Sequence, residues 1–380
     1  MRSALIVLVS LFTAIFPAHA VEPVKIGVSL SLTGKYAELG TLKFNAYKLW
    51  QQDVNQKGGI LGKPVKLIVL DDQSEPNVAK ALYERLIVEE KVDLVLGPYS
   101  SAVTSAVLPV TEKYGYPLLA SGGAADEIWQ QGYKHVFGVY IPASKYTVGF
   151  LELLVTNGIS NIAMIAADDI FSQSVAAGAR EWAKRYGLNV VFFETFKKGA
   201  KDLAPVVTRA KASNAQVFMV LGHFDESVDA RRALKLSGWS PRVYYASVGP
   251  TTQKYYEMLK TDAELSFSSS QWEPSTLLPG SKEFADIFEK TYGSPASYHA
   301  ANAYAAGQIL DAAVNKAKSF DRNKIRDVLS SLDTITIIGR YGVDHTGKQI
   351  RHFARTVQWQ NGKREIVAPA EIMTAKPVWK

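Results

Sequence analysis

The feature that most constrains the fold is a repeated alternation between short apolar runs and longer amphipathic stretches. Val24 to Leu32 is a β-branched run, and after a turn at Thr33-Gly34 apolar residues recur at helical spacing as far as Val54. Three further strand-like runs, each preceded by a helical pattern, lie at 67–70, 94–96 and 117–120. Unbroken apolar strands that alternate with helices predict a parallel sheet covered on both faces.

A second series of the same kind begins after Val136 to Tyr140. Its strand-like runs lie at 162–166, 190–193, 217–221 and 243–246, and helical patterns separate them. A chain of roughly 360 residues after the N-terminal segment is too long for one hydrophobic core, so we expect an α/β protein with two domains. Helical patterns at 283–291 and 297–317 could cover either domain, and 357–367 predicts a hairpin.

The first twenty residues have the pattern of a cleavable secretion signal. Arg2 precedes an apolar stretch from Ala4 to Phe16, and Ala18-His19-Ala20 places small residues where a signal peptidase cuts. The stretch is shorter than the ~20 residues that a membrane-spanning helix needs. Val21, rather than a cysteine, would begin the mature chain, which argues against a lipid anchor. We expect cleavage after Ala20 and an exported, soluble protein in the periplasm of a Gram-negative cell.

The composition excludes several classes of function. The chain has no cysteine, which rules out disulfides, thiolate metal sites and cysteine nucleophiles. Its formal charge of +7 comes from lysine and arginine side chains that are scattered along the sequence. Such scattering predicts a solvated surface, so we expect no binding to nucleic acid or to a membrane.

No catalytic or cofactor motif occurs at the spacing that its chemistry requires. The stretch Gly58 to Lys63 resembles a phosphate-binding loop, but its glycines are one residue too close and Pro64 replaces the magnesium-binding hydroxyl. We interpret this stretch as a turn that follows a helix. The histidines are dispersed along the sequence and suggest no metal site. We therefore expect no enzymatic activity, no cofactor and no metal.

Two loops follow apolar strands at the sheet edge where open α/β proteins bind their ligands. The first, Gly97 to Ser101, leads into a helix, and its serines could cap free backbone N–H groups or receive an anion. The second, Ser121 to Ala124, lets a ligand approach the backbone closely. Spacing alone leaves both the capping interpretation and the binding interpretation open.

Short motifs also recur in a characteristic order along nearly the whole mature chain. They are Lys25 to Val28, Leu32 to Gly34, Gly58 to Gly62, Asp71-Asp72, Gly97 to Ser101, Tyr116 to Leu118, Tyr292-Gly293 and 298–306. Together they resemble the branched-chain, or hydrophobic, amino acid binding family of type I periplasmic solute-binding proteins of ABC transporters. The resemblance implies two Rossmann-like lobes with parallel sheets, joined by a three-segment hinge. The N-terminal lobe would comprise 21–140 and 271–350, and the C-terminal lobe 141–270 and 351–380.

The resemblance also implies where the first lobe holds its ligand. The family's hydroxyl that grips the ligand carboxylate falls on Ser101, in the loop that also contains Tyr99. Its backbone donors fall on the glycine-rich loop, at Gly122, Gly123 and Ala124. Family members commonly have a hydroxyl residue where this chain has Ala124, so one hydrogen bond to the ligand would be missing or supplied by water.

Five further positions carry over to the rest of the pocket. Phe171 would form an aromatic wall in the second lobe, His223 would face the ligand beside it, and Leu39 and Trp272 would close the pocket. The fifth, Ser247, is a departure, because amino-acid-binding members have here an acid that pairs with the ligand's ammonium group. Each of these residues could instead have a purely structural role.

The loss of that acid leaves two alternatives open. An ammonium group buried without a counter-charge costs several kcal/mol. Either another carboxylate takes over the pairing, or the ligand is an aromatic or apolar organic acid without an ammonium group. The candidate carboxylates are Asp168, Asp169, Asp225 and Glu273.

The mechanism implied by the resemblance is closure of two lobes around a small carboxylate ligand, such as a hydrophobic amino acid. The closed protein, which we expect to be a monomer, would then dock on an inner-membrane ABC permease. A sensor that presents its ligand to a membrane receptor and an exported hydrolase are the alternatives, because fold alone does not separate these functions.

Overall fold

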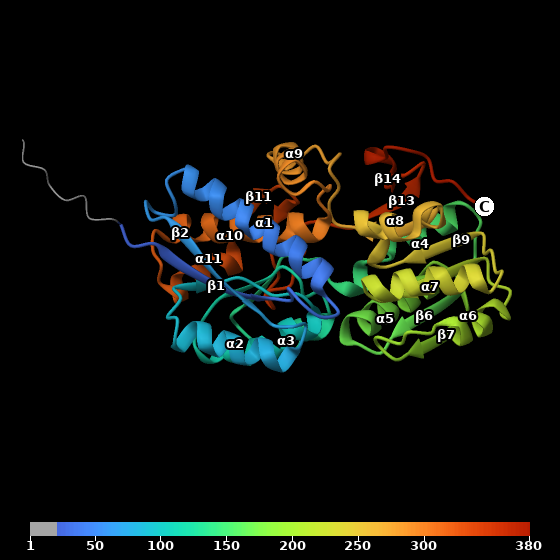
Figure 1. Ribbon diagram of the computed structural model, residues 1–380, viewed down its shortest axis with the longest axis horizontal. Helices are drawn as coiled ribbons and strands as arrows, with labels where there is room; N and C mark the ends of the chain where they lie inside the picture. The colour runs from blue at the N-terminus through green and yellow to red at the C-terminus, as the bar shows by residue number, and fades with distance from the viewer. Residues whose placement is uncertain (1–20) are drawn as a thin grey trace, which may run out of the picture.

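The computed structural model describes residues 21–380, and the expected signal peptide lies outside the described residues. Two lobes lie side by side along the long axis of the molecule (Figure 1). The first lobe contains both the blue N-terminal elements and the orange helices within residues 281–331, whereas the green and yellow elements and the red strands within residues 355–368 form the second lobe (Figure 1). Segments far apart in the sequence therefore build each lobe together.

The first lobe has a parallel sheet of three strands in the order β2-β1-β3 and a parallel pair, β4 and β5. Its strands are β1 (Val24–Leu30), β2 (Val65–Asp71), β3 (Leu94–Val95), β4 (Leu118–Ala120), β5 (Val136–Gly138) and the short antiparallel pair β11 (Thr334–Thr336) and β12 (Gly339–Tyr341). Its helices are α1 (Ala37–Gln56), α2 (Pro76–Val88), α3 (Ser101–Lys113), α9 (Ser281–Tyr292), α10 (Tyr298–Ala317) and α11 (Arg322–Ser331). The loops that follow β3 and β4 are neighbours, because a Cβ on Gly122 would lie 2.3 Å from the Pro98 carbonyl oxygen.

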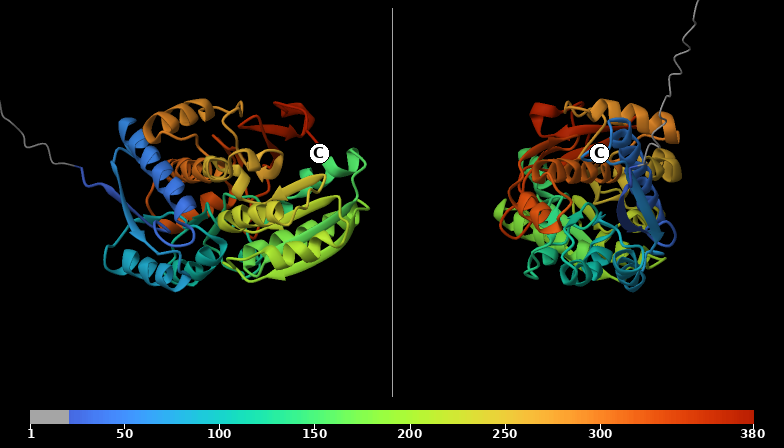
Figure 2. Two further views of the ribbon diagram at one scale, coloured as in Figure 1. Left: turned by 45° about the vertical axis from the view of Figure 1, so that its right-hand side comes forward. Right: turned by 90° about the vertical axis from the view of Figure 1, so that its left-hand side faces the viewer.

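The position of α10 settles which lobe the late helices cover. This helix packs along the blue helix α1 (Figure 2). It also contacts β4 and α11. The approach to α1 is close, since a Cβ on Gly307 would lie 2.2 Å from the Trp50 ring. Helix α9 also packs on α1, so both late helices belong to the first lobe. The amino end of α10 consequently points residues 298 and 299 toward the junction of the lobes, as the contacts below show.

The second lobe is built on one seven-stranded sheet in the order β14-β13-β10-β9-β8-β6-β7. Its strands are β6 (Asn161–Ala167), β7 (Asn189–Phe196), β8 (Val217–Leu221), β9 (Val243–Ala246), β10 (Ser266–Ser270), β13 (Arg355–Gln360) and β14 (Lys363–Ala368). Its helices are α4 (Val148–Thr156), α5 (Ile170–Arg185), α6 (Ala204–Lys211), α7 (Phe224–Leu236) and α8 (Gln253–Leu259). The first five strands in sequence are parallel, and the predicted C-terminal hairpin adds β13 and β14 in antiparallel order.

The chain passes between the two sets of sheets three times, after β5, after β10 and before β13. Gln271 connects the three crossing segments. Its side-chain oxygen accepts a hydrogen bond from the Ile141 N–H at 2.9 Å, and its backbone carbonyl accepts one from Arg355 at 2.6 Å. The side-chain nitrogen of Gln271 donates to the Tyr146 hydroxyl at 2.9 Å. A buried amide thus ties the crossings together. The residue limits given above for each lobe stay a prediction.

The sequence did not predict every element. Strand β10 has the sequence Ser-Phe-Ser-Ser-Ser, which lacks an apolar run, yet all five residues are buried. Hydrogen bonds satisfy its serines, for example Ser268 to the Ala246 carbonyl at 2.6 Å and Ser269 with the Tyr245 hydroxyl at 2.9 Å. Helices α8 and α11 and the pair β11-β12 are short additions that no periodic pattern indicated. None of the helices within residues 21–380 combines the length and the apolarity needed to span a bilayer.

Candidate ligand-binding site

A small cavity lies between the two lobes, where the loops that follow several strands meet. Its volume is about 10 Å³, close to that of one water molecule. The lining residues are Tyr99, Ser101, Gly122, Ala124, Tyr140, Tyr146, Phe171, His223, Val248, Tyr298 and His299. Six of the ten positions that sequence reasoning selected are among them, so residues from both lobes are brought together as the family resemblance implies.

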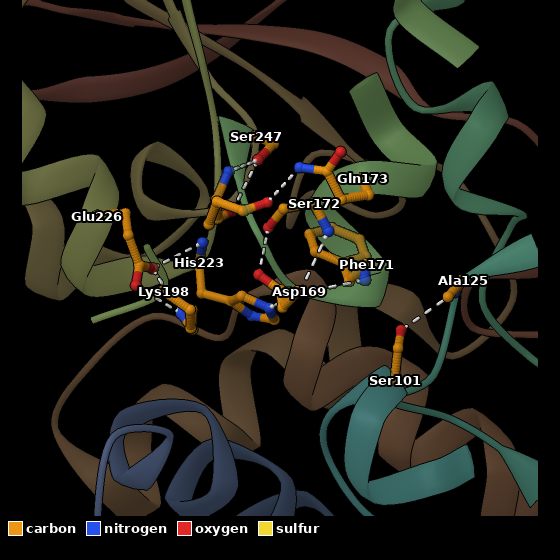
Figure 3. Close-up of polar contacts among 12 residues, drawn as sticks. Ser101, Ala125, Asp169, Phe171, Ser172, Gln173, Lys198, His223, Glu226 and Ser247 are labelled. Atoms are coloured by element: carbon orange, nitrogen blue, oxygen red, sulfur yellow. Dashed lines mark hydrogen bonds and ion pairs between the residues drawn. The ribbon is translucent and has the colours of Figure 1, made fainter. Parts of the chain in front are cut away.

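Ser101, the first residue of α3, has a hydroxyl that is oriented by the neighbouring loop. Its Oγ accepts hydrogen bonds from the N–H of Ala124 at 3.0 Å and of Ala125 at 3.1 Å (Figure 3). With both lone pairs engaged, the remaining capacity of the hydroxyl is to donate its own proton. The group is buried and borders the cavity, so it offers a single donor to an anionic group there.

The two glycines of the loop after β4 are required by close packing. A Cβ on Gly122 would lie 2.3 Å from the Pro98 carbonyl oxygen, and a Cβ on Gly123 would lie 2.8 Å from the Thr104 side chain. Within residues 21–380, the backbone N–H of neither glycine has a hydrogen-bond acceptor. Only Gly122 lines the cavity. The loop therefore supplies unpaired donors next to Ser101, which suits a carboxylate.

The second-lobe wall contains Asp169, which caps the amino end of α5. One carboxylate oxygen accepts from the N–H of Phe171 at 3.1 Å and of Ser172 at 3.2 Å, and the other accepts from the Ser172 hydroxyl at 2.6 Å. Burial alone would raise the pKa of this carboxyl, but His223, Ser172 and Lys198 outweigh it and hold the pKa well below its usual range. The cap also explains why α5 starts at Ile170, five residues before the helical pattern that the sequence indicated.

His223 stands at the amino end of α7 and joins the two lobes. Its Nε2 lies 3.1 Å from Asp169 Oδ1 (Figure 3). Its Nδ1 lies 3.1 Å from the hydroxyl of Tyr99 in the first lobe. The backbone N–H of His223 donates to Glu226 at 3.0 Å, and Glu226 forms an ion pair of 2.7 Å with Lys198. With Nε2–H donating to Asp169, Nδ1 accepts the Tyr99 hydroxyl proton. Both ring nitrogens are thus engaged.

Sequence reasoning missed five lining residues: Tyr140, Tyr146, Val248, Tyr298 and His299. The Tyr140 hydroxyl lies 2.8 Å from His299 Nδ1, and burial lowers the pKa of His299 well below its ordinary value, so the ring is neutral. The hydroxyl of Tyr298 and the Nε2 of His299 are buried and have no hydrogen-bond partner among residues 21–380. The only signal for these positions was the resemblance that continued through 298–306, because the helical pattern itself did not indicate a lobe.

The remaining four predicted site residues do not line the cavity. The Ser247 hydroxyl is already hydrogen-bonded to the Gly222 backbone: it donates to the Gly222 carbonyl at 2.7 Å and accepts from the Gly222 N–H at 3.0 Å. The neighbouring Val248 lines the cavity in its place. Trp272 is buried in the first lobe, where its indole N–H donates to Ser281 at 2.7 Å. Leu39 on α1 and Gly123 are buried beside the site.

The four carboxylates considered as partners for an ammonium group are all engaged or exposed. Asp169 is held by His223 and the amino end of α5, and Glu273 forms an ion pair of 2.8 Å with Arg364. Asp168 and Asp225 are exposed side chains. Among the lining residues there is no aspartate, glutamate, lysine or arginine. Within the described part of the chain, no group of three acidic or histidine side chains has the arrangement of a metal site.

Two α/β lobes on a hinge of three crossings, with a cavity between the lobes, define a ligand-enclosing binding protein. A sequence profile of the periplasmic binding protein family matches residues 23–364, and the chain belongs to that family. This confirms both the resemblance and the fold class inferred from the sequence.

Individual relatives agree with this assignment. The Leu/Ile/Val-binding protein homolog 7 of Brucella suis is 27% identical over 377 residues, which cover 93% of each chain. The branched-chain amino acid transporter substrate binding protein LivJ of Streptococcus pneumoniae, solved with isoleucine, has a TM-score of 0.83 at 22% identity over 92% of this chain and 100% of its own. An ABC transporter solute binding protein of R. palustris, solved with benzoate, has a TM-score of 0.82 at 17% identity over 93% and 99%.

Proposed function

We propose that this protein is the periplasmic solute-binding component of an ABC importer, and that its ligand is an aromatic or apolar carboxylate without an ammonium group. The observation that carries the choice of ligand is the absence of any acidic side chain from the cavity lining described above. The relatives named above include proteins solved with an amino acid and with an aromatic acid, so ligand chemistry must be argued from this chain's own residues.

The electrostatic argument is one of desolvation. An ammonium group enclosed between the lobes would lose its hydration. Asp169, the candidate acid that contacts the lining residue His223, already accepts four hydrogen bonds, one of them from His223. An unpaired buried charge costs several kcal/mol, comparable with the whole binding free energy of a micromolar ligand, about 8 kcal/mol. A carboxylate meets the opposite situation. The Ser101 hydroxyl and the N–H of Gly122, which both border the cavity, have no competing acceptor within residues 21–380, and the neighbouring Gly123 N–H is likewise unpaired there.

The body of the ligand would meet mainly rings. Phe171 and Tyr146 pack edge to face with centroids 5.4 Å apart, and Tyr99 lies 6.0 Å from the His223 ring. Such walls favour an apolar or aromatic body through burial and ring contacts. A cavity of about 10 Å³ holds no such body, so the ligand would keep the lobes further apart than they are here.

Binding would begin on the first lobe and be completed by closure of the second. In the arrangement described here the lobes meet through Tyr99 with His223 at 3.1 Å and through the Asp126 N–H with the Ser174 hydroxyl at 3.2 Å, and a ligand enclosed between the lobes would hold these contacts partly open. A ligand that prefers the closed arrangement shifts the hinge equilibrium toward it. The closed monomer would then deliver its ligand to an inner-membrane permease without chemical change.

The test is a thermal-shift screen on refolded, ligand-stripped protein. Benzoate, phenylacetate and hexanoate are compared with leucine, isoleucine and phenylalanine, since a ligand selective for the native state raises the melting temperature. We expect shifts from one or more of the plain acids and none from the amino acids. Shifts from the amino acids alone would overturn the proposed ligand class and favour the hydrophobic amino acid interpretation, which the name of the Brucella relative supports.

The expected transport role has its own measurement. Small-angle scattering with and without the ligand found in the screen should show a more compact particle when it is bound, and its mass should be that of one chain. Deletion of the gene should abolish uptake of that ligand by the cell. Uptake that continues unchanged, with a chemotactic or signalling defect instead, would favour the sensor alternative.

A further inference from the structure

The cavity has a second polar region that a carboxylate clamp does not use. We call it the polar corner: Tyr140, Tyr298 and His299, where the hinge meets the first turn of α10. The rings are in close contact, with centroids of Tyr298 and His299 3.9 Å apart and those of Tyr140 and Tyr298 5.6 Å apart. All three side chains line the cavity and are at least 98% buried.

Two polar atoms of the polar corner have no partner. The Tyr298 hydroxyl and His299 Nε2 are inaccessible to solvent and make no hydrogen bond within the described residues. Burial raises the pKa of Tyr298 most, and the nearby Tyr146 hydroxyl raises it further. The geometry between the two hydroxyls is nevertheless not that of a hydrogen bond. Each buried unpaired polar group costs about 1–3 kcal/mol, so a pair of them in one cavity calls for a missing partner.

The hydrogen-bonding pattern limits what that partner can be. His299 is neutral, so one ring nitrogen carries a proton and the other does not. If Tyr140 donates to Nδ1, then Nε2–H is a donor, and if Nδ1–H donates to Tyr140, then Nε2 is an acceptor. The Tyr298 hydroxyl can take either role. A hydroxyl group both donates and accepts, so it can satisfy both atoms with either tautomer of His299. A methyl group or a ring C–H satisfies neither.

We propose that the polar corner recognises a hydroxyl group on the ligand, so that this protein selects hydroxylated aromatic carboxylates over the unsubstituted acids. This inference rests on the proposed function, because it takes the carboxylate to be held by Ser101 and the glycine loop. The ligand then has two polar ends and an aromatic body between them. Leaving the corner unpaired penalises any analogue that lacks the hydroxyl.

The test is isothermal titration of refolded, ligand-stripped protein with benzoate and the three monohydroxybenzoates. We expect at least one hydroxybenzoate to bind tenfold or more tightly than benzoate. In Tyr298→Phe and in His299→Phe, this preference, measured as the ratio of the two dissociation constants, should fall below threefold. Benzoate that binds as well as every hydroxybenzoate, or a preference that survives both variants, overturns the inference and leaves the proposed function standing. If none of the four acids binds, the inference fails, and the thermal-shift screen with phenylacetate and hexanoate decides the proposed function separately.

A matched control separates recognition from folding. Tyr245 is equally buried, but its hydroxyl is bonded to Ser269 at 2.9 Å and it does not line the cavity. Tyr245→Phe should lower the melting temperature of the ligand-free protein and leave the preference for the hydroxyl intact. Tyr298→Phe should not lower the melting temperature, since the hydroxyl that it removes has no partner. A drop as large as that of Tyr245→Phe would assign Tyr298 a structural role and contradict the inference.

Discussion

The two walls of the cavity differ in how fully their polar groups are satisfied. On the second-lobe wall, Asp169 accepts four hydrogen bonds, both ring nitrogens of His223 are engaged, and Glu226 is paired with Lys198. On the first-lobe wall, polar groups remain without partners: the N–H groups of the glycine loop and, within residues 21–380, the Tyr298 hydroxyl and His299 Nε2.

This difference assigns different tasks to the lobes. Unpaired buried groups are costly, and a protein retains them where a ligand completes their hydrogen bonds. A fully paired network holds its side chains in fixed positions and gains little from a ligand. The first-lobe wall therefore acts as a binding platform, and the second-lobe wall acts as a preformed cover. The platform consists of Ser101, the glycine loop, Tyr298 and His299, and the cover of Asp169 and His223. Substitutions in the platform should weaken binding far more than substitutions in the cover.

The largest expected effect comes from filling the space behind the platform. In Gly122→Ala, the new methyl group would lie 2.3 Å from the Pro98 carbonyl oxygen, so the loop must shift. We expect ligand affinity to fall roughly 100-fold, or by about 3 kcal/mol, as measured by calorimetry with the ligand from the screen. Gly149→Ala is the matched control, because its methyl would meet the Thr356 hydroxyl at 3.4 Å and the Ala354 carbonyl oxygen at 3.9 Å, both ordinary contacts. Equal affinities for the two variants would remove the glycine loop from the platform.

Removal of the Ser101 hydroxyl should have the next largest effect. Ser101→Ala deletes the donor to the ligand. It also removes the acceptor of the Ala124 and Ala125 N–H groups, which then lose their hydrogen bonds. We expect binding to weaken by about 1–3 kcal/mol, the cost of unpaired buried partners. Ser105→Ala on the same helix loses only the contact with Gln131 at the surface and should bind normally. Unchanged affinity in Ser101→Ala would mean that the carboxylate is held elsewhere.

A third prediction concerns a buried lysine beneath the platform. Lys43 donates to the carbonyl and the hydroxyl of Ser121 at 2.8 and 2.7 Å, and burial lowers the pKa of its amine well below the ordinary value. Between the lowered pKa and the ordinary one, the unfolded chain binds more protons than the folded chain does, so folding gains stability as pH rises. The free energy of unfolding of the wild type, relative to that of Lys43→Met, should therefore rise by up to about 1.4 kcal/mol per pH unit above neutrality.

Urea unfolding at pH 7, 8 and 9 measures this difference. Lys48→Met, on the same helix but only half-buried, serves as the control and should show no such slope. If the stability gap between wild type and Lys43→Met is constant across the three pH values, the Lys43 amine stays protonated, and the platform carries a buried cation instead of a neutral donor.

The fold was predictable because its signals are local. Apolar runs such as Ile162 to Ala166 are nearly the whole of a buried strand, and helices α1 and α10 follow apolar spacing. Strand β10 was missed because its stability comes from serine hydrogen bonds to neighbouring strands, for example Ser268 to the Ala246 carbonyl at 2.6 Å. Contacts of that kind between distant segments leave no periodic pattern in the sequence.

The site was predictable only in part for the same reason. Ser101 and Gly122 follow apolar strands, so their position at the sheet edge could be inferred from local pattern. Tyr298 and His299 reach the cavity because α10 returns to the first lobe and points its first turn at the hinge, which depends on packing against α1. The hydrogen bonds between Ser247 and the Gly222 backbone could likewise not be predicted, because they join two loops that are 25 residues apart in the sequence.

The smallest effect is expected in the cover. Asp169→Asn keeps an N-cap for α5 but removes the charge beside His223, so we expect affinity to fall by only about 0.5–1 kcal/mol, through faster ligand release in stopped-flow. Because the folded pKa of Asp169 is depressed, its carboxylate stabilises the protein above the ordinary pKa near 4, and this is lost as pH falls further. The difference in free energy of unfolding between the wild type and Asp169→Asn should therefore shrink as pH falls below about 4. Asp168 is exposed, so Asp168→Asn should differ little from the wild type in stability at any pH. A loss of binding as large as that of Gly122→Ala would make the second lobe a platform too.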